Sequence, residues 1–173
     1  AAAQLLTPEG LTGLLEAADI WLETDPDQAF ALAGLCQLAA SVTGAAAVLA
    51  RAAYLRGQLH AMRGEFDLAL TMIEAARTGY DQLGMTLESL RTNVGLMRVL
   101  GETGRYGEAL DIGQRVVDGI TANHTPEHDL LVAHVQRNSA DILGMSGILT
   151  TSIEPMAETV WLLEQAGLRS RAV

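Results

Sequence analysis

The stretch that decides the fold is GQLHAMRGEFDLAL, residues 57–70. Within it, the small residue Gly57 precedes Gly64 by seven positions, and the aromatic Phe66 follows Gly64 by two. Ala69 follows that same glycine by five positions. Glycine readily takes the left-handed conformation that ends a helix and begins a tight turn. We therefore expect two helices joined at Gly64, with Phe66 filling the open end and Gly57 facing Ala69 so that the helices approach closely.

The second half of this pattern returns in residues 104–110, which read GRYGEAL, at a period of about 40 residues. Gly44 and Gly84 are separated by the same interval, and we expect both to close helices. Gly104 corresponds to Gly64 and is expected in a tight turn. A fixed period of this length is typical of a stack of helix pairs, because one pair cannot bury its apolar face alone.

Apolar residues at helical spacing cover nearly the whole chain, and alternating β-branched segments are absent, so we expect an all-α protein. Thr7-Pro8 and Asp25-Pro26 each place a capping side chain before a proline, which is typical of a helix start. The expected helices are 8–22, 26–42, 45–62, 66–82, 86–102, 106–121, 127–145 and 154–166. They form about four hairpins, 8–42, 45–83, 86–122 and 126–167, in one domain that spans residues 1–173.

The GRYGEAL string and the spacing around Gly64 resemble the tetratricopeptide repeat, most sharply in residues 47–122. This resemblance implies a right-handed α-solenoid of antiparallel hairpins. The chain departs from the family in its period of about 40 residues rather than 34, and in Met97 at the position of the small Gly57. The third copy, residues 143–149, lacks the aromatic, so we expect an irregular turn over 146–153.

Longer repeats of this kind are similar to arrays found ahead of caspase-like CHAT protease domains in bacteria, and to arrays in large bacterial regulators. The resemblance concerns the parent protein, because nothing in this chain resembles the protease itself. Residues 167–172 read like the entry into another hairpin, so we expect a piece of a longer array.

Composition narrows the class of protein. Hydrophobic residues make up 49% of the chain and charged residues 18%, which excludes a disordered chain, and no apolar run is long enough to span a bilayer. A net charge of −10 disfavours nucleic acid and anionic membranes as partners. The start of the chain lacks the pattern of a secretory signal, so a cytoplasmic location is expected. Cys36 lies in an apolar run and is expected in the core.

The resemblance to tetratricopeptide stacks also implies a binding groove, lined by the first helix of each hairpin. Transferring the family's pattern selects three sets of residues. These are Arg51, Tyr54, Gln58 and Met62; Arg91, Val94, Arg98 and Glu102; and His134, Arg137, Asp141 and Met145. Every one of the 11 basic residues is arginine, whose forked guanidinium suits carboxylates. The expected ligand is an acidic or C-terminal peptide. The alternative is that these arginines pair with Glu88, Glu102 and Asp141 on solvated helix faces.

The first hairpin presents an apolar set that is large for a solvated face, namely Leu11, Leu14, Ala18, Trp21 and Leu22. Leu14, Trp21 and Leu22 therefore form a candidate apolar contact surface. Trp21 either packs onto an adjoining helix or a preceding repeat, or it anchors a partner.

Signals of catalysis are weak. His124 and His128 have metal-ligand spacing, but Pro126 lies between them and no third ligand is evident. His134, Ser139 and Asp141 do not share a helix face in the way that a triad needs, and no phosphate-binding glycine loop is present. His60 is expected to be a hydrogen-bonded core residue. We expect no enzyme, metal or cofactor, but a protein-interaction scaffold; the alternative is a structural spacer or self-association segment of a larger signalling, regulatory or CHAT-protease protein.

Overall fold

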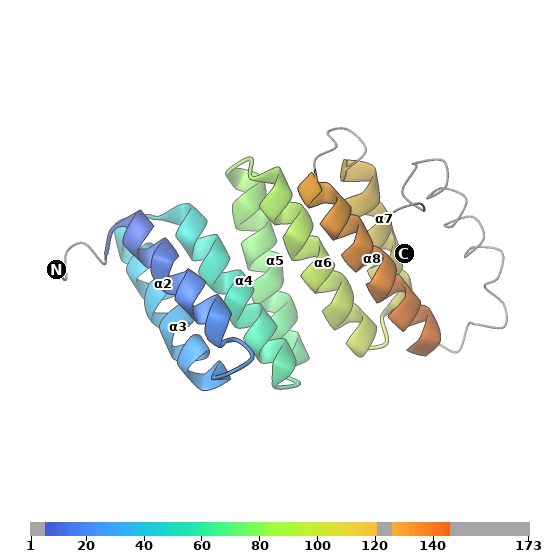
Figure 1. The fold of residues 1–173 in the computed structure, drawn as a ribbon, viewed down its shortest axis with the longest axis horizontal. Coiled ribbons are helices and arrows are strands. Elements are labelled where there is room, and N and C mark those ends of the chain that lie inside the picture. The colour runs from blue at the N-terminus through green and yellow to red at the C-terminus, as the bar shows by residue number, and fades with distance from the viewer. Residues whose placement is uncertain (1–5, 121–125, 146–173) are drawn as a thin grey trace.

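The computed structural model describes residues 6–120 and 126–145, and in that part the chain is all-α, with no strand. The helices are α2 (Pro8–Trp21), α3 (Pro26–Thr43), α4 (Ala46–Met62), α5 (Phe66–Gln82), α6 (Thr86–Glu102), α7 (Tyr106–Ile120) and α8 (Pro126–Met145). Each helix packs against the next in the sequence (Figure 1). The expected helices in this part are confirmed, with bounds within one residue. The helix expected at 154–166 and the turn expected at 146–153 lie outside the described residues.

The two proline start signals are confirmed as helix caps. The Thr7 hydroxyl accepts a hydrogen bond from the Gly10 N–H at 3.2 Å, and the Asp25 carboxylate accepts one from the Gln28 N–H at 3.1 Å. A side-chain oxygen at this position satisfies one of the N–H groups that a helix start leaves unbonded. These two helices therefore begin where the local sequence directs.

Four glycines set the turns, and they are evenly spaced along the chain. Gly44, Gly64, Gly84 and Gly104 have φ of 73°, 75°, 67° and 75°. The N–H of the residue after each glycine donates to the carbonyl five positions earlier, at 2.9 to 3.1 Å. This is the Schellman motif, and its left-handed residue favours glycine because no Cβ is strained. The sequence suggested two kinds of turn, whereas all four glycines make the same one.

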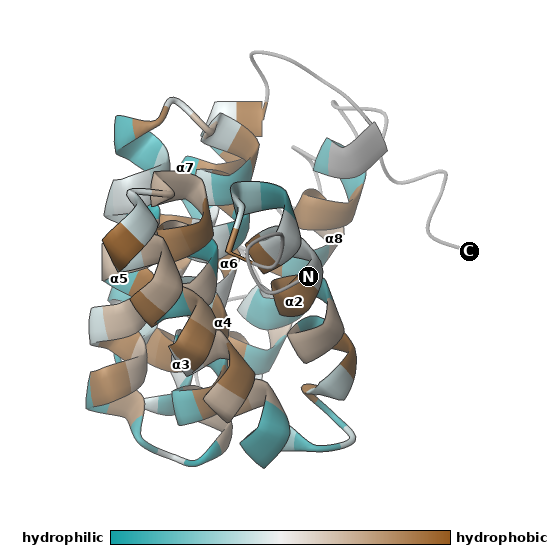
Figure 2. Ribbon diagram, turned by 90° about the vertical axis from the view of Figure 1, so that its left-hand side faces the viewer, coloured by the Kyte–Doolittle hydropathy of each residue, from teal (hydrophilic) through white to brown (hydrophobic). Residues whose placement is uncertain are grey.

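The helices form two layers. The even-numbered helices contact one another in order, α2 with α4, α4 with α6 and α6 with α8, and they lie toward the viewer in Figure 1. Figure 2 looks along the stack and shows α3, α5 and α7 on the opposite side. One face of the molecule is thus made by α2, α4, α6 and α8, and the other by α3, α5 and α7.

Close approach between α4 and α5 depends on Gly57. A Cβ at this position would lie 2.6 Å from the Ile73 Cγ1 and 3.2 Å from the Ala69 carbonyl oxygen, so only glycine fits. Between α6 and α7 the large residue lies on the first helix and the glycine on the second. Met97 is fully buried, and its sulfur lies 3.2 Å from the Cβ position of Gly113. The large and small residues therefore trade places between corresponding positions of the two repeats, and both helix pairs stay close.

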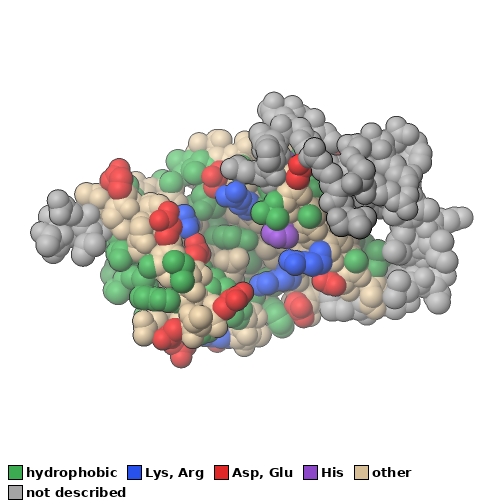
Figure 3. All heavy atoms as spheres, in the orientation of Figure 1, with side chains coloured by type: hydrophobic (Ala, Val, Ile, Leu, Met, Phe, Trp, Pro, Cys, Tyr) green, Lys and Arg blue, Asp and Glu red, His purple; other side chains and the backbone are tan. Residues whose placement is uncertain are grey.

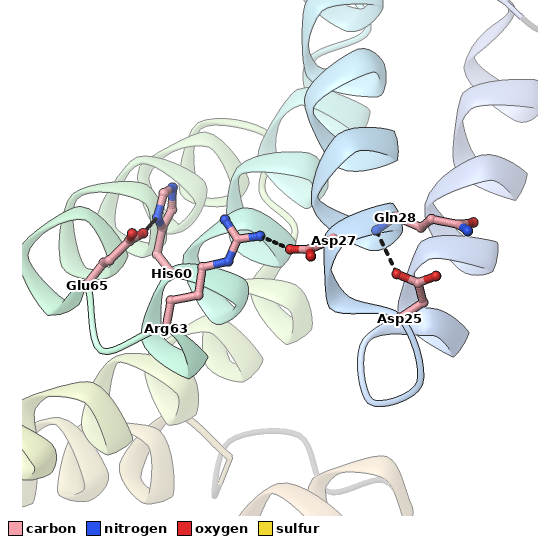
Figure 4. A network of polar contacts seen from close by, with 6 residues as sticks. All are labelled: Asp25, Asp27, Gln28, His60, Arg63 and Glu65. Atoms are coloured by element: carbon pink, nitrogen blue, oxygen red, sulfur yellow. Dashed lines mark hydrogen bonds and ion pairs between the residues drawn. The ribbon is translucent and has the colours of Figure 1, made fainter.

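Polar contacts join the first helix pair to the next. The Arg63 guanidinium stacks 4.4 Å from the centre of the Phe30 ring and bonds the Asp27 carboxylate at 2.6 Å (Figure 4). His60 is 7% exposed, its Nδ1 lies 2.5 Å from a Glu65 carboxylate oxygen, and its ring meets Phe30 edge-on. The expectation of a hydrogen-bonded core histidine is confirmed, and so is the buried position of Cys36.

Exchanging large and small residues between α4 and α5 tests the packing rule. We expect Gly57→Met alone to destabilise the fold by about 1–3 kcal/mol or more, because the added side chain has no space against Ile73. Combining it with Ile73→Gly recreates the Met97 and Gly113 arrangement. The double variant should be more stable than the sum of the two single effects predicts, by roughly 0.5–3 kcal/mol. Urea unfolding followed by circular dichroism measures this, and strict additivity would contradict the packing rule.

Candidate functional site

A groove runs along the face made by the even-numbered helices. It consists of two adjoining hollows, of about 320 Å³ and about 400 Å³, that share Tyr54, Gln58 and Arg91 in their walls. The first hollow lies between α4, α6 and α8, with Ile73 of α5 in its wall, and the second between α2, α4 and α6, with Tyr80 of α5. Figure 3 shows basic side chains and a histidine gathered on this face over α6 and α8.

Tyr54 forms the boundary between the two hollows. Its hydroxyl donates a hydrogen bond to the Arg91 carbonyl at 3.2 Å, so α4 is tied to the backbone of α6. Gly95 allows this contact, because a Cβ there would lie 2.7 Å from the hydroxyl oxygen. Burial raises the pKa of Tyr54 to about 12, although the charge of Arg98 acts to lower it. The phenol therefore stays neutral and acts as a fixed hydrogen-bond donor.

The first hollow is basic. Arg91, Arg98 and Arg137 are exposed in its walls with half-buried His134 beside them, and none of the described residues that line it is an aspartate or glutamate. Within the described residues, none of these three arginines forms an ion pair. Each guanidinium keeps its five N–H donors for water or a ligand. A chain of net charge −10 thus holds a local positive site.

The second hollow has mixed charge. Arg51 is bonded to Asp19 at 2.5 Å, and Glu88 also lines the wall. Burial raises the pKa of Tyr80, which lines this hollow as well, to about 12. Positive charge is partly neutralised here, so an anionic group is attracted mainly to the first hollow.

Most of the residues selected from the sequence line this groove. In its walls are Arg51, Tyr54, Gln58, Arg91, Val94, Arg98, His134 and Arg137. Met62, Glu102 and Asp141 are exposed and line neither hollow. The alternative pairing of the arginines with Glu88, Glu102 and Asp141 is absent from the described residues. The one groove arginine that is paired, Arg51, uses Asp19 instead.

Other wall residues were not selected from the sequence. Asn138 is 9% exposed, and its amide donates to the Val94 carbonyl at 3.4 Å, which links α8 to α6. The repeat period points to Asn138, since it corresponds to Arg98. Gly95 and Leu130 carry no such signal, because a glycine or a leucine in a helical run reads as ordinary helix.

The candidate apolar surface of the first helix pair is mostly used inside the fold. Leu11 and Ala18 are buried, and Leu14 and Leu22 pack partly buried against the same cluster. Trp21 remains 36% exposed at the end of α2. The apolar set therefore chiefly forms the core of the first helix pair, with Trp21 at its edge.

The expected metal and membrane features can be compared with the part of the chain that the structure describes. There, no group of three histidine, cysteine or acidic residues is placed to hold a metal ion. His128 lies in the first turn of α8, and His124 lies outside the described residues. None of the helices in the described ranges is long and apolar enough to cross a membrane.

Comparison with protein-family models, with curated proteins and with solved structures gives no match.

The raised pKa values of Tyr54 and Tyr80 predict how the stability of the fold changes at high pH. Because the folded pKa of Tyr54 and Tyr80 is about 12, above the ordinary 10, their stabilising effect is complete below pH 10 and is lost as the pH rises through 12. Absorbance at 295 nm should show two late-ionising phenols, and Tyr54→Phe should remove one of them. Ionisation of Tyr54 near pH 10 while the helical circular dichroism signal persists would contradict its burial.

Proposed function

We propose that this chain is a protein-interaction scaffold whose groove binds an acidic or C-terminal peptide segment. The observation that carries the proposal is the first hollow. Among the described residues, Arg91, Arg98 and Arg137 have no ion pair there and no carboxylate lines the wall. In a chain of net charge −10 this arrangement requires a reason, because nearby acids would ordinarily neutralise it.

The chemistry of the hollow fits a carboxylate attached to an apolar side chain. Arginine forks bind carboxylates through two parallel hydrogen bonds, which are stronger than neutral ones. Val94, Leu130 and Leu131 lie in the same wall and offer apolar contact beside the charged groups. A peptide can place its carboxylate between α6 and α8 and continue past Tyr54 into the mixed second hollow.

We also propose that the helix stack is a right-handed superhelix of antiparallel hairpins of the tetratricopeptide type. The even spacing of the left-handed glycines and the small residue at Gly57 support this. So does Phe66, which packs partly buried against the core where α5 begins. In such a superhelix the groove is the concave face. The long repeat period supports a place within a longer array of a bacterial regulatory or CHAT-protease protein.

A peptide-binding measurement tests the proposed function. The 173-residue chain is presented with a library of peptides that vary in acidic residues and in free or amidated C-termini. We expect acidic or free-carboxylate peptides to bind, and Arg98→Gln with Arg137→Gln to weaken that binding by roughly tenfold or more, because charge-assisted hydrogen bonds are lost. The matched control is Arg115→Gln on α7, an exposed arginine that lines neither hollow.

The salt dependence of binding and the choice of peptide show which group of the peptide the groove recognises. Binding through exposed charges should weaken as ionic strength rises. If amidation of the C-terminus abolishes binding, the groove recognises the terminal carboxylate. If binding persists after amidation, it recognises acidic side chains. If no peptide binds, or if the α7 control weakens binding as much as the groove variant, the scaffold proposal fails and the structural-spacer alternative replaces it.

A further inference from the structure

Helix α3 carries an apolar stripe on the side that faces away from its neighbours. Leu35, Leu38 and Val42 are 65%, 63% and 80% exposed, and Ala31 continues the line. The spacings along the stripe are four, three and four residues, which keeps the four side chains on one side of a helix. The core-facing side is equally apolar and consists of Ala29, Ala33, Cys36 and Ala40. Figure 2 shows hydrophobic colours along much of α3.

The fold does not require this stripe to be apolar. The corresponding residues on α5, one repeat period later, are Thr71, Ala75, Thr78 and Gln82, and all are exposed. On α7 the corresponding residues Asp111, Arg115 and Asp118 are exposed and charged. The same positions are therefore polar or small on two helices of this chain and strongly apolar on the third. Exposed apolar patches of this kind mark interaction surfaces.

Stacking of a further helix pair would not cover the stripe. In Figure 1, α5 lies between α3 and α7, and its residues at these positions are nevertheless exposed. Neighbours within a stack of this geometry thus leave the outward positions open. The stripe also lies on the opposite layer from the groove, which the even-numbered helices line with contributions from α5. Its occupant must approach from outside the stack.

We propose that the stripe is covered by α3 of a second copy of this chain, in a symmetric antiparallel helix pair. Spacings of three and four residues are those of two helices that pack along a common seam. In the antiparallel arrangement Leu35 lies opposite the partner's Leu38, and Ala31 lies opposite the partner's Val42. The larger Val42 at one end of the stripe thus meets the small Ala31 of the partner, and the leucines meet in the middle. Alternation of large and small side chains is how facing positions interlock.

The electrical character of the stripe favours a second copy over a charged partner. Ala31, Gly34, Leu35, Leu38 and Val42 carry no charge, and neither do Gln37, Ala39 and Ser41 beside them. Asp27, one turn before Ala31, is already paired with Arg63, and Arg56, which donates to Gln37, is half-buried. The stripe itself therefore offers no free charge to an acidic or basic protein, whereas identical uncharged surfaces complement each other in an isologous contact. A seam of four residues per copy is short compared with the ~1,600 Å² of a standard interface, so we expect a weak and reversible dimer.

Sedimentation of the 173-residue chain tests the dimer. The wild-type chain should pass from monomer to dimer as its concentration rises through the micromolar range. Leu35→Glu should weaken the dimer at least tenfold, because it brings a charge against the partner's Leu38. The matched control, Ala75→Glu, introduces the same charge at the corresponding exposed position of α5 and should leave the dimer unchanged. Circular dichroism checks that both variants stay folded.

A cross-linking experiment tests the direction of pairing. In a Cys36→Ala background, Ala31→Cys chains are mixed with Val42→Cys chains and treated with a short bis-maleimide. The antiparallel pair predicts that the mixture links and that each variant alone does not, because like positions lie about 16 Å apart along the helix. Links within each variant alone would indicate a parallel pair and overturn the proposal. A wild-type chain that stays monomeric, or a dimer that survives Leu35→Glu, would also overturn it.

Discussion

The close contact between the two helices of each pair is the constraint on which the rest of the structure depends. Gly57 lets α5 approach α4 until Ile73 fills the space of a side chain, and Gly113 does the same for Met97. The glycine turns then return the chain at equal intervals from α3 to α7, so that α4 and α6 lie side by side. Across these two helices the Tyr54 hydroxyl donates to the Arg91 carbonyl, a contact for which Gly95 leaves the space.

Local signals explain why the helices were predictable and other features were not. Proline starts and glycine turns act over a few residues, so the bounds of α2 to α8 follow from the sequence. Met97 looked like a departure because its compensation, Gly113, lies on another helix and outside the local pattern. The pattern taken from the tetratricopeptide resemblance placed most groove residues. The partner of Arg51, however, is 32 residues distant, and Asp141 lies outside the groove. The α3 stripe was missed because an apolar helix reads as core from its sequence.

The two layers of the molecule differ in what they offer to other molecules. The even-numbered helices present arginines that the described residues leave without ion pairs, and these suit a carboxylate ligand. On the opposite side, α3 presents uncharged leucine and valine, which suit a like surface. Because the surfaces lie on opposite layers, one copy can occupy the α3 stripe while the groove stays open. Two grooves held in one dimer would bind a partner with two acidic segments more tightly than one groove does.

Peptide binding by this chain would depend most on the basic first hollow, where the arginines would hold a carboxylate. The most direct measurement is nuclear magnetic resonance of the arginine side-chain Nε–H groups while an acidic peptide is added. We expect the signals of Arg91, Arg98 and Arg137 to shift together. Those of Arg63 and Arg105 should not move, because these side chains are already bonded to Asp27 and Glu108. Unchanged signals from the three groove arginines, or equal shifts with an uncharged peptide, would contradict this expectation.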